Sequence, residues 1–151
     1  MGPINLLSSL DFSVNNVILK AWYTLLRIRR GKDKMKKGMV FLIEDDKALI
    51  GVEKRFIQEG GHEIILLACS RQEALDKISQ AKELGVNVAV IDGNLGTGPN
   101  DGPEVARALK ETIAGIKIIS FSGDIVGWGD FNPRKPSDIS NLGETVTKSI
   151  S

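Results

Sequence analysis

A short apolar run that ends in a single carboxylate constrains the fold of this chain more than any other feature. The run Val88–Ile91 leads directly into Asp92, and glycine and polar residues follow. A run of this length, rich in β-branched residues and bounded by turn residues, is typical of a strand that is buried on both faces of a parallel sheet. In open parallel sheets, ligands bind in the crevice outside the carboxyl ends of the strands. Asp92 is therefore expected in a ligand-binding or catalytic site.

Strand and helix patterns alternate from Met39 onward. Apolar runs typical of strands lie at 39–43, 63–68, 87–91 and 116–121, with a short fifth one around Phe131. Helical spacing, capping residues and terminal glycines predict helices over 47–59, 71–84, from Pro103, and from Ser137 or Asp138 to about 150. His62, which follows a glycine pair, is expected in an exposed turn. The alternation predicts a doubly wound α/β fold around a parallel, five-stranded sheet.

Basic residues are concentrated near the start of the chain. Residues 1–38 hold eight Lys or Arg against two Asp or Glu, whereas residues 39–151 hold twelve against seventeen. A basic leader over 1–38 therefore precedes an acidic domain over 39–151. Apolar residues at helical spacing predict an amphipathic helix over about 14–30 within the leader.

The leader has three interpretations. In the first, it is a disordered or non-native extension from an upstream start codon, since Met35 and Met39 offer later start sites. In the second, its helix, 14–30, contacts the domain, a partner or an anionic membrane surface. The third is nucleic-acid binding, but no recognition motif accompanies the basic cluster, so direct DNA binding is not expected. No uncharged apolar run approaches the ~20 residues that span a bilayer. The single cysteine, Cys69, cannot form an internal disulfide, which favours a reducing, cytoplasmic location.

Polar residues follow three of the predicted strands and precede the last helix. The first strand ends in Glu44, Asp45 and Asp46, the third in Asp92 and the fourth in a segment with Ser122, and Lys135 comes before the last helix. If the first and third strands are neighbours, their carboxylates converge, and such a cluster needs a cation to neutralise it. Oxygen ligands favour a hard ion such as Mg²⁺. A carboxylate held this way can attack phosphorus, while the metal and a lysine offset the charge of the transferred group.

These strand ends resemble those of a known family. The segments 40–46, Ile91-Asp92, 118–123 and Lys135-Pro136 are similar to the motifs of the receiver domain of bacterial two-component response regulators, over residues 39–150. Each motif alone is weak, but here all of them occur in order, each at a predicted strand end. The resemblance implies a flavodoxin-like sheet with strand order 2-1-3-4-5.

The resemblance also implies a role for each polar residue. Asp92 would be the phosphoacceptor, and Glu44, Asp45, Asp92 itself and the backbone carbonyl of Asn94 would hold Mg²⁺. Asp46 would be the next residue outward. Alternatively, Asp92 is a loop carboxylate or a helix cap, and the acidic triplet is a solvated helix start.

In such a protein, Ser122 and Lys135 would contact the phosphoryl group. Ser122 would be the switch hydroxyl, and Lys135 would form an ion pair with the phosphoryl group. However, Lys135 follows Ser122 by only 13 positions, and the residues between them include Gly123, Gly127, Gly129 and Pro133. This interval is too short and too rich in glycine for the helix and strand that normally fill it. The fourth helix of the domain is therefore expected to be reduced or absent. The loop 93–102 after Asp92 is also longer than usual in the family.

The resemblance implies a stand-alone response regulator that is not an enzyme beyond its own phosphorylation and dephosphorylation. A histidine kinase or phosphotransfer protein would phosphorylate Asp92, and the signal would pass through protein contacts, because the chain ends with the last predicted helix. One alternative is an interaction module that works without phosphorylation. The other is a phosphatase of the haloacid-dehalogenase type, which would need a second aspartate where this chain has Asn94.

Overall fold

The structure is a computed structural model that describes residues 17–25 and 36–151. The chain divides into two compact units, residues 1–35 and 36–151. In the first unit, residues 17–25 are helical and expose large apolar side chains, among them Trp22 and Tyr23. The rest of the helix expected over 14–30 lies outside the described residues. No helix in the described part of the chain is long and apolar enough to cross a membrane.

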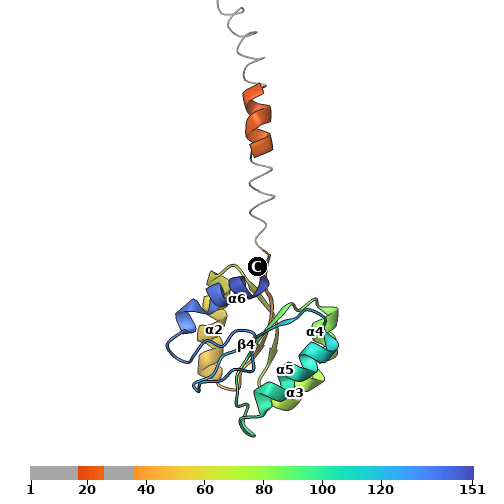
Figure 1. Cartoon of the computed structure of the whole chain (residues 1–151), viewed down its shortest axis with the longest axis vertical. Helices are drawn as coiled ribbons and strands as arrows, with labels where there is room; N and C mark the ends of the chain where they lie inside the picture. The colour runs from red at the N-terminus through yellow and green to blue at the C-terminus, as the bar shows by residue number, and fades with distance from the viewer. Residues whose placement is uncertain (1–16, 26–35) are drawn as a thin grey trace, which may run out of the picture. The chain divides into compact units, whose positions relative to one another are not determined.

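The second unit is built on one parallel sheet (Figure 1). Its strands are β1 (Met39–Ile43), β2 (Glu63–Ala68), β3 (Val88–Ile91) and β4 (Lys117–Ser120), in the order β2-β1-β3-β4. Their registers pair Ile43 with both Ala68 and Ile91, and Ile91 with Ser120. All four strands therefore end level, and the residues that follow them gather along one edge, which we call the carboxyl edge.

Helices cover both faces of the sheet, as a doubly wound fold requires (Figure 1). On one face lie α2 (Lys47–Glu59) and α6 (Leu142–Ile150), the latter preceded by the 3₁₀ turn η1 (Ile139–Asn141). On the other lie α3 (Arg71–Asp76), α4 (Ile78–Glu83) and α5 (Asp101–Thr112). Alternate strand residues divide between the two cores: Val40 and Leu42 pack on the α2 side, and Phe41 and Ile43 on the α3 side.

The sequence correctly located most of these elements, with small differences. The single helix expected over 71–84 is two, because α3 ends at Asp76 and α4 starts at Ile78. Ser70 caps α3 by accepting a hydrogen bond from the Glu73 amide at 3.1 Å. The Glu73 carboxylate, however, accepts from the Cys69 amide at 2.8 Å, one residue before the partner that a capping box predicts.

The expected five-stranded sheet is wrong in one respect: the sheet has four strands, and only two isolated bridges, Ile119 to Phe131 and Ser122 to Arg134, stand where a fifth would pair. Two side chains contact β4 beside these bridges, and one of them, Asp130, takes the place of a backbone acceptor. Asp130 accepts a hydrogen bond from the Ile118 amide at 2.8 Å, and Asn132 accepts one from the Ser120 hydroxyl at 2.6 Å. Pro133 has no N–H to donate. As expected, residues 121–138 contain no helix.

His62 is buried, so the expectation of an exposed turn residue is wrong. It lies at the opposite, amino edge of the sheet, where its Nδ1 accepts a hydrogen bond from the Gly38 amide at 2.9 Å. Its Nε2 therefore carries the proton, and lies 3.1 Å from the Gly143 carbonyl and 2.8 Å from the Thr147 hydroxyl. The ring thus ties the segment before β1 to α6.

Candidate functional site

Three carboxylates meet at the carboxyl edge, between β1 and β3. Glu44 and Asp45 follow β1, and Asp92 follows β3. The Asp92 amide donates a hydrogen bond to the Ile43 carbonyl of β1 at 2.9 Å. One oxygen from each of Glu44, Asp45 and Asp92 lies within 4.8 Å of the others. Because β1 and β3 are neighbours while β2 and β4 flank them, this point is the topological switch point, where ligands bind in such sheets.

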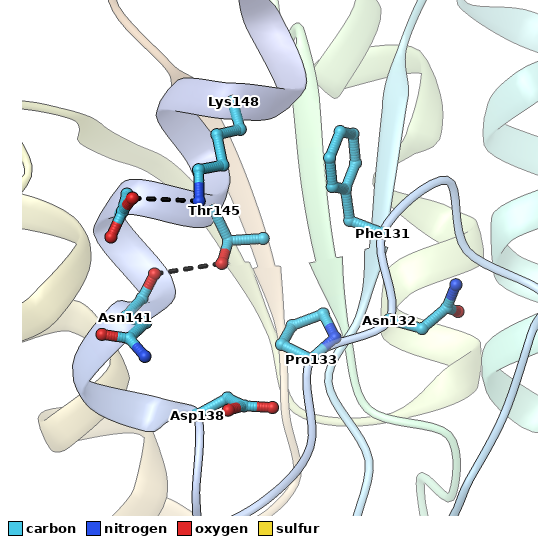
Figure 2. Close-up of a pocket in the computed structure, with 8 residues that line it drawn as sticks. Phe131, Asn132, Pro133, Asp138, Asn141, Thr145 and Lys148 are labelled. Atoms are coloured by element: carbon cyan, nitrogen blue, oxygen red, sulfur yellow. Dashed lines mark hydrogen bonds and ion pairs between the residues drawn. The ribbon is translucent and has the colours of Figure 1, made fainter.

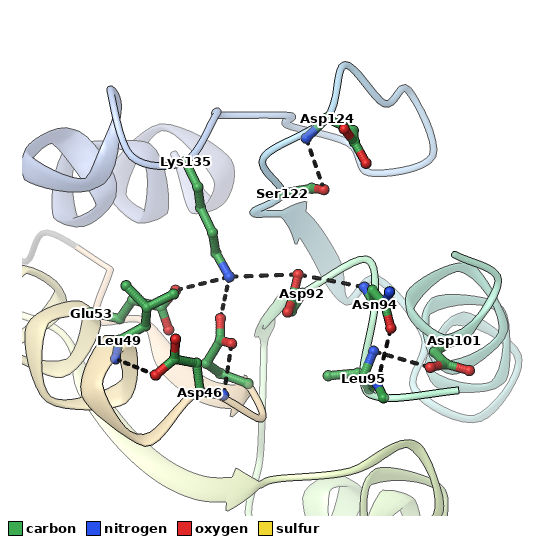
Figure 3. A network of polar contacts seen from close by, with 12 residues as sticks. Asp46, Leu49, Glu53, Asp92, Asn94, Leu95, Asp101, Ser122, Asp124 and Lys135 are labelled. Atoms are coloured by element: carbon green, nitrogen blue, oxygen red, sulfur yellow. Dashed lines mark hydrogen bonds and ion pairs between the residues drawn. The ribbon is translucent and has the colours of Figure 1, made fainter. Parts of the chain in front are cut away.

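The Lys135 ammonium lies beside this group, and Figure 3 shows it between Asp92 and the side chain of Glu53. It contacts Glu44 Oε2 directly and lies 3.5 Å from Asp92 Oδ1. The lysine is brought there by its own backbone, whose amide donates to the Ser122 carbonyl at 2.8 Å. The ring of Phe121, with its centroid 5.3 Å from Nζ, forms an apolar wall beside it. The sequence-predicted lysine therefore does reach the sequence-predicted aspartate.

A fourth carboxyl group, which the sequence analysis missed, is that of Glu53 on α2. Its side chain is only 1% exposed, and Oε1 lies 3.7 Å from Lys135 Nζ. Neither of its oxygens has a hydrogen-bond partner. A signal for it exists in the sequence: Ile50, Glu53 and Ile57 follow helical spacing and form the buried stripe of α2.

Burial and mutual repulsion shift the protonation of these groups. Burial, with a contribution from Glu44, raises the pKa of Asp92 to about 6, although Lys135 opposes the shift. Burial and the nearby Glu44 carboxylate raise the pKa of Glu53 to about 8. Burial disfavours the charge on Lys135, but its contacts with Glu44 and Asp92 outweigh that and raise its pKa above the usual value. A buried cluster with more acids than bases is a candidate functional site on physical grounds.

Ser122 and Asn94 lie near Asp92 without sharing a close side-chain contact with it. The Ser122 hydroxyl accepts a hydrogen bond from the Asp124 amide at 3.3 Å, and a Cβ added to Gly93 would lie 3.2 Å from it. The hydroxyl thus faces the residue directly after Asp92. The Asn94 amide points to Asp92 Oδ1 at 3.5 Å, and its side chain accepts from the Gly96 amide at 3.0 Å.

Asp46, the outermost acid of the triplet, caps α2. Its side chain accepts hydrogen bonds from the Ala48 amide at 2.9 Å and the Leu49 amide at 3.4 Å. Its own amide donates to Glu44 Oε1 at 3.1 Å. Asp46 therefore fixes the start of α2 and the orientation of Glu44. The alternative that the acidic triplet is a helix start thus describes Asp46, but not Glu44 or Asp45.

A second residue that the sequence analysis missed, Asp101, organises the long loop after Asp92. Its buried carboxylate accepts hydrogen bonds from the amides of Leu95, Thr97 and Gly98, each at 3.0 Å. Next to it, Gly102 packs so closely that an added Cβ would lie 2.5 Å from the Asp92 carbonyl. The loop is long, yet its backbone is held firmly against the phosphoacceptor candidate.

The donor set fits a hard divalent cation. The three converging side chains, Glu44, Asp45 and Asp92, offer carboxylate oxygens alone, which suit Mg²⁺ or Ca²⁺. Asp45 is exposed, so the group opens to solvent on that side. One lysine does not balance the negative charge of this edge, and a divalent ion would.

No protein-family model matches the sequence, and no curated protein matches it. Solved structures match the fold. A CheY-like receiver domain protein from Methanospirillum hungatei JF-1 has a TM-score of 0.63 at 21% identity, covering 76% of this chain and 94% of that one. The response regulator domain of Thermotoga maritima CheB has a TM-score of 0.63 at 17% identity, with coverages of 76% and 97%.

A third match is a response regulator from Burkholderia pseudomallei, solved with a phosphorylated aspartic acid, a calcium ion and citrate. Its TM-score is 0.60 at 17% identity, and the match covers 76% of this chain and 67% of that one. Identities this low establish the fold alone. The second unit of the chain has the flavodoxin-like fold of response regulator receiver domains, with a parallel sheet of four strands.

Proposed function

We propose that this chain is a stand-alone response regulator that accepts a phosphoryl group on Asp92 from a histidine kinase or a phosphotransfer protein. The observation that carries the proposal is the position of Asp92 beside Glu44 and Asp45 on one side and the Lys135 ammonium on the other. A receiver-fold protein of this kind, the Burkholderia pseudomallei regulator, was solved with a phosphorylated aspartic acid and a calcium ion.

Phosphorylation begins with the ionised carboxylate of Asp92. With a pKa of about 6, it is mostly ionised at neutral pH. One of its oxygens attacks the phosphorus of a donor phosphohistidine, the new P–O bond forms as the P–N bond breaks, and the imidazole leaves and takes up a proton. Glu44, Asp45, Asp92 and the Asn94 carbonyl would hold Mg²⁺, which would neutralise part of the charge of the transferred group.

Lys135 and Ser122 then respond to the acyl phosphate. The Lys135 ammonium, already 3.5 Å from Asp92 Oδ1, offsets the charge of the phosphoryl oxygens. The Ser122 hydroxyl exchanges its bond with the Asp124 amide for one to a phosphoryl oxygen. Because Ser122 and Lys135 lie within the segment 121–138, their movement changes the surface of this segment and its affinity for a protein partner.

The leader and the domain have separate roles in this proposal. Residues 39–151 carry the phosphorylation chemistry, and the basic leader, 1–38, contacts a partner or an anionic membrane surface through its helix. The apolar side chains that helix 17–25 exposes support such a contact. The protein would work in the cytoplasm, where Cys69 stays reduced.

Intact-mass measurement with acetyl phosphate tests the proposal. In the presence of Mg²⁺, the protein should gain the mass of one phosphoryl group, and Asp92→Asn should gain none. Chelation of Mg²⁺ should suppress the adduct in the wild type. If neither an adduct nor donor hydrolysis occurs with Mg²⁺, the acidic site does not carry out receiver chemistry.

A constitutive interaction module is the second candidate. It is favoured by the segment 121–138, which lacks the helix that normally responds to phosphorylation. This candidate predicts that a partner binds equally well with and without phosphorylation. The phosphatase alternative gains no support, because Asn94 offers an amide, not an acid, to protonate a leaving group, and its side chain is directed to the Gly96 amide.

A further inference from the structure

Helix 17–25 of the first unit exposes a large apolar surface. Its six large apolar side chains are each between 47% and 73% exposed, and they are Val17, Ile18, Leu19, Trp22, Tyr23 and Leu25. Apolar side chains gathered in this way on a protein surface mark a place that another molecule covers. The polar and charged residues in and around the helix indicate which kind of molecule that is.

The polar residues of this helix form a narrow stripe. Lys20 and Thr24 are four positions apart, so they lie one turn apart on the same side of the helix. Arg27 continues this spacing in the sequence. The apolar residues include two runs of three, Val17–Leu19 and Ala21–Tyr23, and each run spreads over about 200° of the helix, since consecutive residues are about 100° apart. The helix is therefore apolar on every side except this stripe.

The width of the apolar surface favours a lipid surface over a groove in a protein. A protein groove covers one face of a helix, through residues at i, i+3, i+4 and i+7. A helix that lies in the headgroup region of a bilayer is instead surrounded by lipid and turns its polar stripe to the water. Trp22 and Tyr23 suit this position, because aromatic rings with a polar atom gather at membrane–water interfaces. Lys20 can extend its ammonium to the headgroups.

The charge of the chain after this helix indicates that the lipid is anionic. Residues 27–37 hold seven Lys or Arg and one acid, Asp33, and no acid occurs between Asp11 and Asp33. A basic segment directly after an apolar helix binds anionic headgroups, and each Lys or Arg near the surface strengthens binding about fivefold. The same charge disfavours association of two copies through this helix, because a second basic segment would come with it.

The pocket of the domain that Figure 2 shows does not match this helix. It lies between Phe131–Pro133 and α6 and has a volume of about 300 Å³. Phe131 and Pro133 are its apolar residues, whereas Asp138, Asn141 and Glu144 line it with carboxylate and amide groups. Two apolar residues in a small polar pocket do not offer a surface for the six apolar side chains of helix 17–25.

We propose that helix 17–25 binds an anionic lipid surface, with its apolar side chains among the lipids and with electrostatic attraction from the basic residues that follow it in the sequence. In the proposed function, the leader contacts a partner or a membrane; the inference rests on that role and selects the membrane. Neither Asp92 nor Lys135 takes part in this contact. The leader therefore keeps the receiver domain at the membrane both with and without a phosphoryl group.

Binding of the full-length protein to vesicles tests the proposal. The vesicles contain either phosphatidylcholine alone or phosphatidylcholine and the anionic lipid phosphatidylglycerol in equal parts, and binding is measured by co-sedimentation. The protein should bind the anionic vesicles at least tenfold more tightly than the others. Raising the NaCl concentration from about 0.1 M to 1 M shortens the Debye length from about 10 Å to 3 Å and should release most of the protein.

Two variants separate the electrostatic part of the contact from the apolar part. Combined substitution of Arg27, Arg29 and Arg30 by Gln should weaken binding to the anionic vesicles about a hundredfold, because three basic residues are lost. Trp22→Ala should weaken it about tenfold through the loss of apolar surface. Alanine is the best helix former, so this second loss does not come from a weaker helix.

The matched control removes three positive charges from exposed positions of the domain, by combined substitution of Arg55, Lys82 and Arg107 by Gln, and should bind as the wild type does. Equal binding to the two kinds of vesicle, or equal effects of the two triple substitutions, would overturn the inference. A dimer that Trp22→Ala abolishes, in a protein that does not bind vesicles, would show that a second copy covers the helix.

The proposed function and this inference can fail separately. If acetyl phosphate and Mg²⁺ produce the adduct on Asp92 but the protein does not bind anionic vesicles, phosphorylation stands and the lipid contact is refuted. If the protein binds the vesicles with the expected dependence on charge but gains no phosphoryl group, the reverse holds.

Discussion

Two buried polar side chains, at opposite edges of the same sheet, are treated very differently by the fold. At the amino edge, both ring nitrogens of His62 have partners, the Gly38 amide on one side and the Gly143 carbonyl and Thr147 hydroxyl on the other. At the carboxyl edge, neither oxygen of Glu53 has a hydrogen bond. Buried polar groups that serve only the fold are normally satisfied. The comparison teaches that an unsatisfied one, set beside a lysine and two other carboxylates, indicates a functional site.

The largest expected effect is on the His62 side of the comparison. His62→Ala leaves the Gly38 amide and the Gly143 carbonyl without their partner and opens a cavity beside α6, so unfolding in urea should show a loss of about 2–3 kcal/mol. Thr147→Val removes only one of the contacts and should cost less. A loss below about 0.5 kcal/mol in His62→Ala would mean that the ring is not a structural tie, since that is the range of ordinary surface substitutions.

Asp101 separates the effect of hydrogen bonding from the effect of location. It lies at the carboxyl edge, as Glu53 does, but its carboxylate is satisfied by the amides of Leu95, Thr97 and Gly98. Burial alone would raise the pKa of Asp101, but the bonds from these amides and from the Thr97 hydroxyl lower it. Asp101→Asn places an amide N–H against those donors and should cost about 2 kcal/mol in urea unfolding.

The control for this change is Asp124→Asn, in an exposed part of the segment 121–138, which should be neutral. If Asp101→Asn is equally neutral, the hydrogen bonds around Asp101 do not hold the loop. The hydrogen-bonded Asp101 and the unbonded Glu53 would then not differ in how hydrogen bonding affects the free energy of unfolding, which contradicts the contrast drawn above.

Glu53→Met should act in the opposite direction. It replaces a buried carboxyl group that has no hydrogen bonds with an apolar side chain of similar volume, and the free energy of unfolding should rise by about 1–2 kcal/mol. Glu59→Met, on the exposed end of the same helix, is the matched control and should change stability little. A destabilised Glu53→Met would show that the carboxyl group supports the fold, in contradiction to the contrast with His62.

The features that the sequence predicted well depend on strong local patterns. The apolar run Val88–Ile91 defines a strand, and the residue after it, Asp92, is found at the strand end. Glu44 and Lys135 were expected near Asp92, and the structure brings both to it. The alternation of elements gave the layered architecture, because each strand and helix carries its own period of apolar residues.

What the sequence did not reveal depends on tertiary contacts. Glu53 reads as one more charged residue of a helix until Ile50 and Ile57 are seen to share its face. His62 follows two glycines, which suggests an exposed turn, but α6, which comes more than 70 residues later in the chain, covers it. The expected fifth strand is also absent: beside β4, the Asp130 side chain takes the place of a backbone carbonyl at the Ile118 amide, which no local pattern predicts.

A dependence of stability on pH is the smallest effect expected, and it belongs to the amino edge. Burial lowers the pKa of His62 below its usual value, with the Gly143 carbonyl opposing the shift. The neutral ring is required because Nδ1 accepts from the Gly38 amide, so its contribution to stability is complete above about pH 6.5, the value for an unfolded histidine. It is lost as the pH falls below that value through the lower pKa of the folded state.

Urea unfolding at pH 7.5, 6.5 and 5.5 without divalent ions measures this loss. Carboxyl groups such as Asp92 also titrate in part of this range, so the contribution of His62 is the difference between the wild type and His62→Gln. The wild type should lose more stability than the variant on going from pH 7.5 to 5.5. Equal losses would mean that His62 takes up its proton as easily in the folded chain as in the unfolded one. In that case, His62 would titrate like an exposed histidine despite its hydrogen bonds, and only the carboxyl edge would shift the pKa of its buried groups.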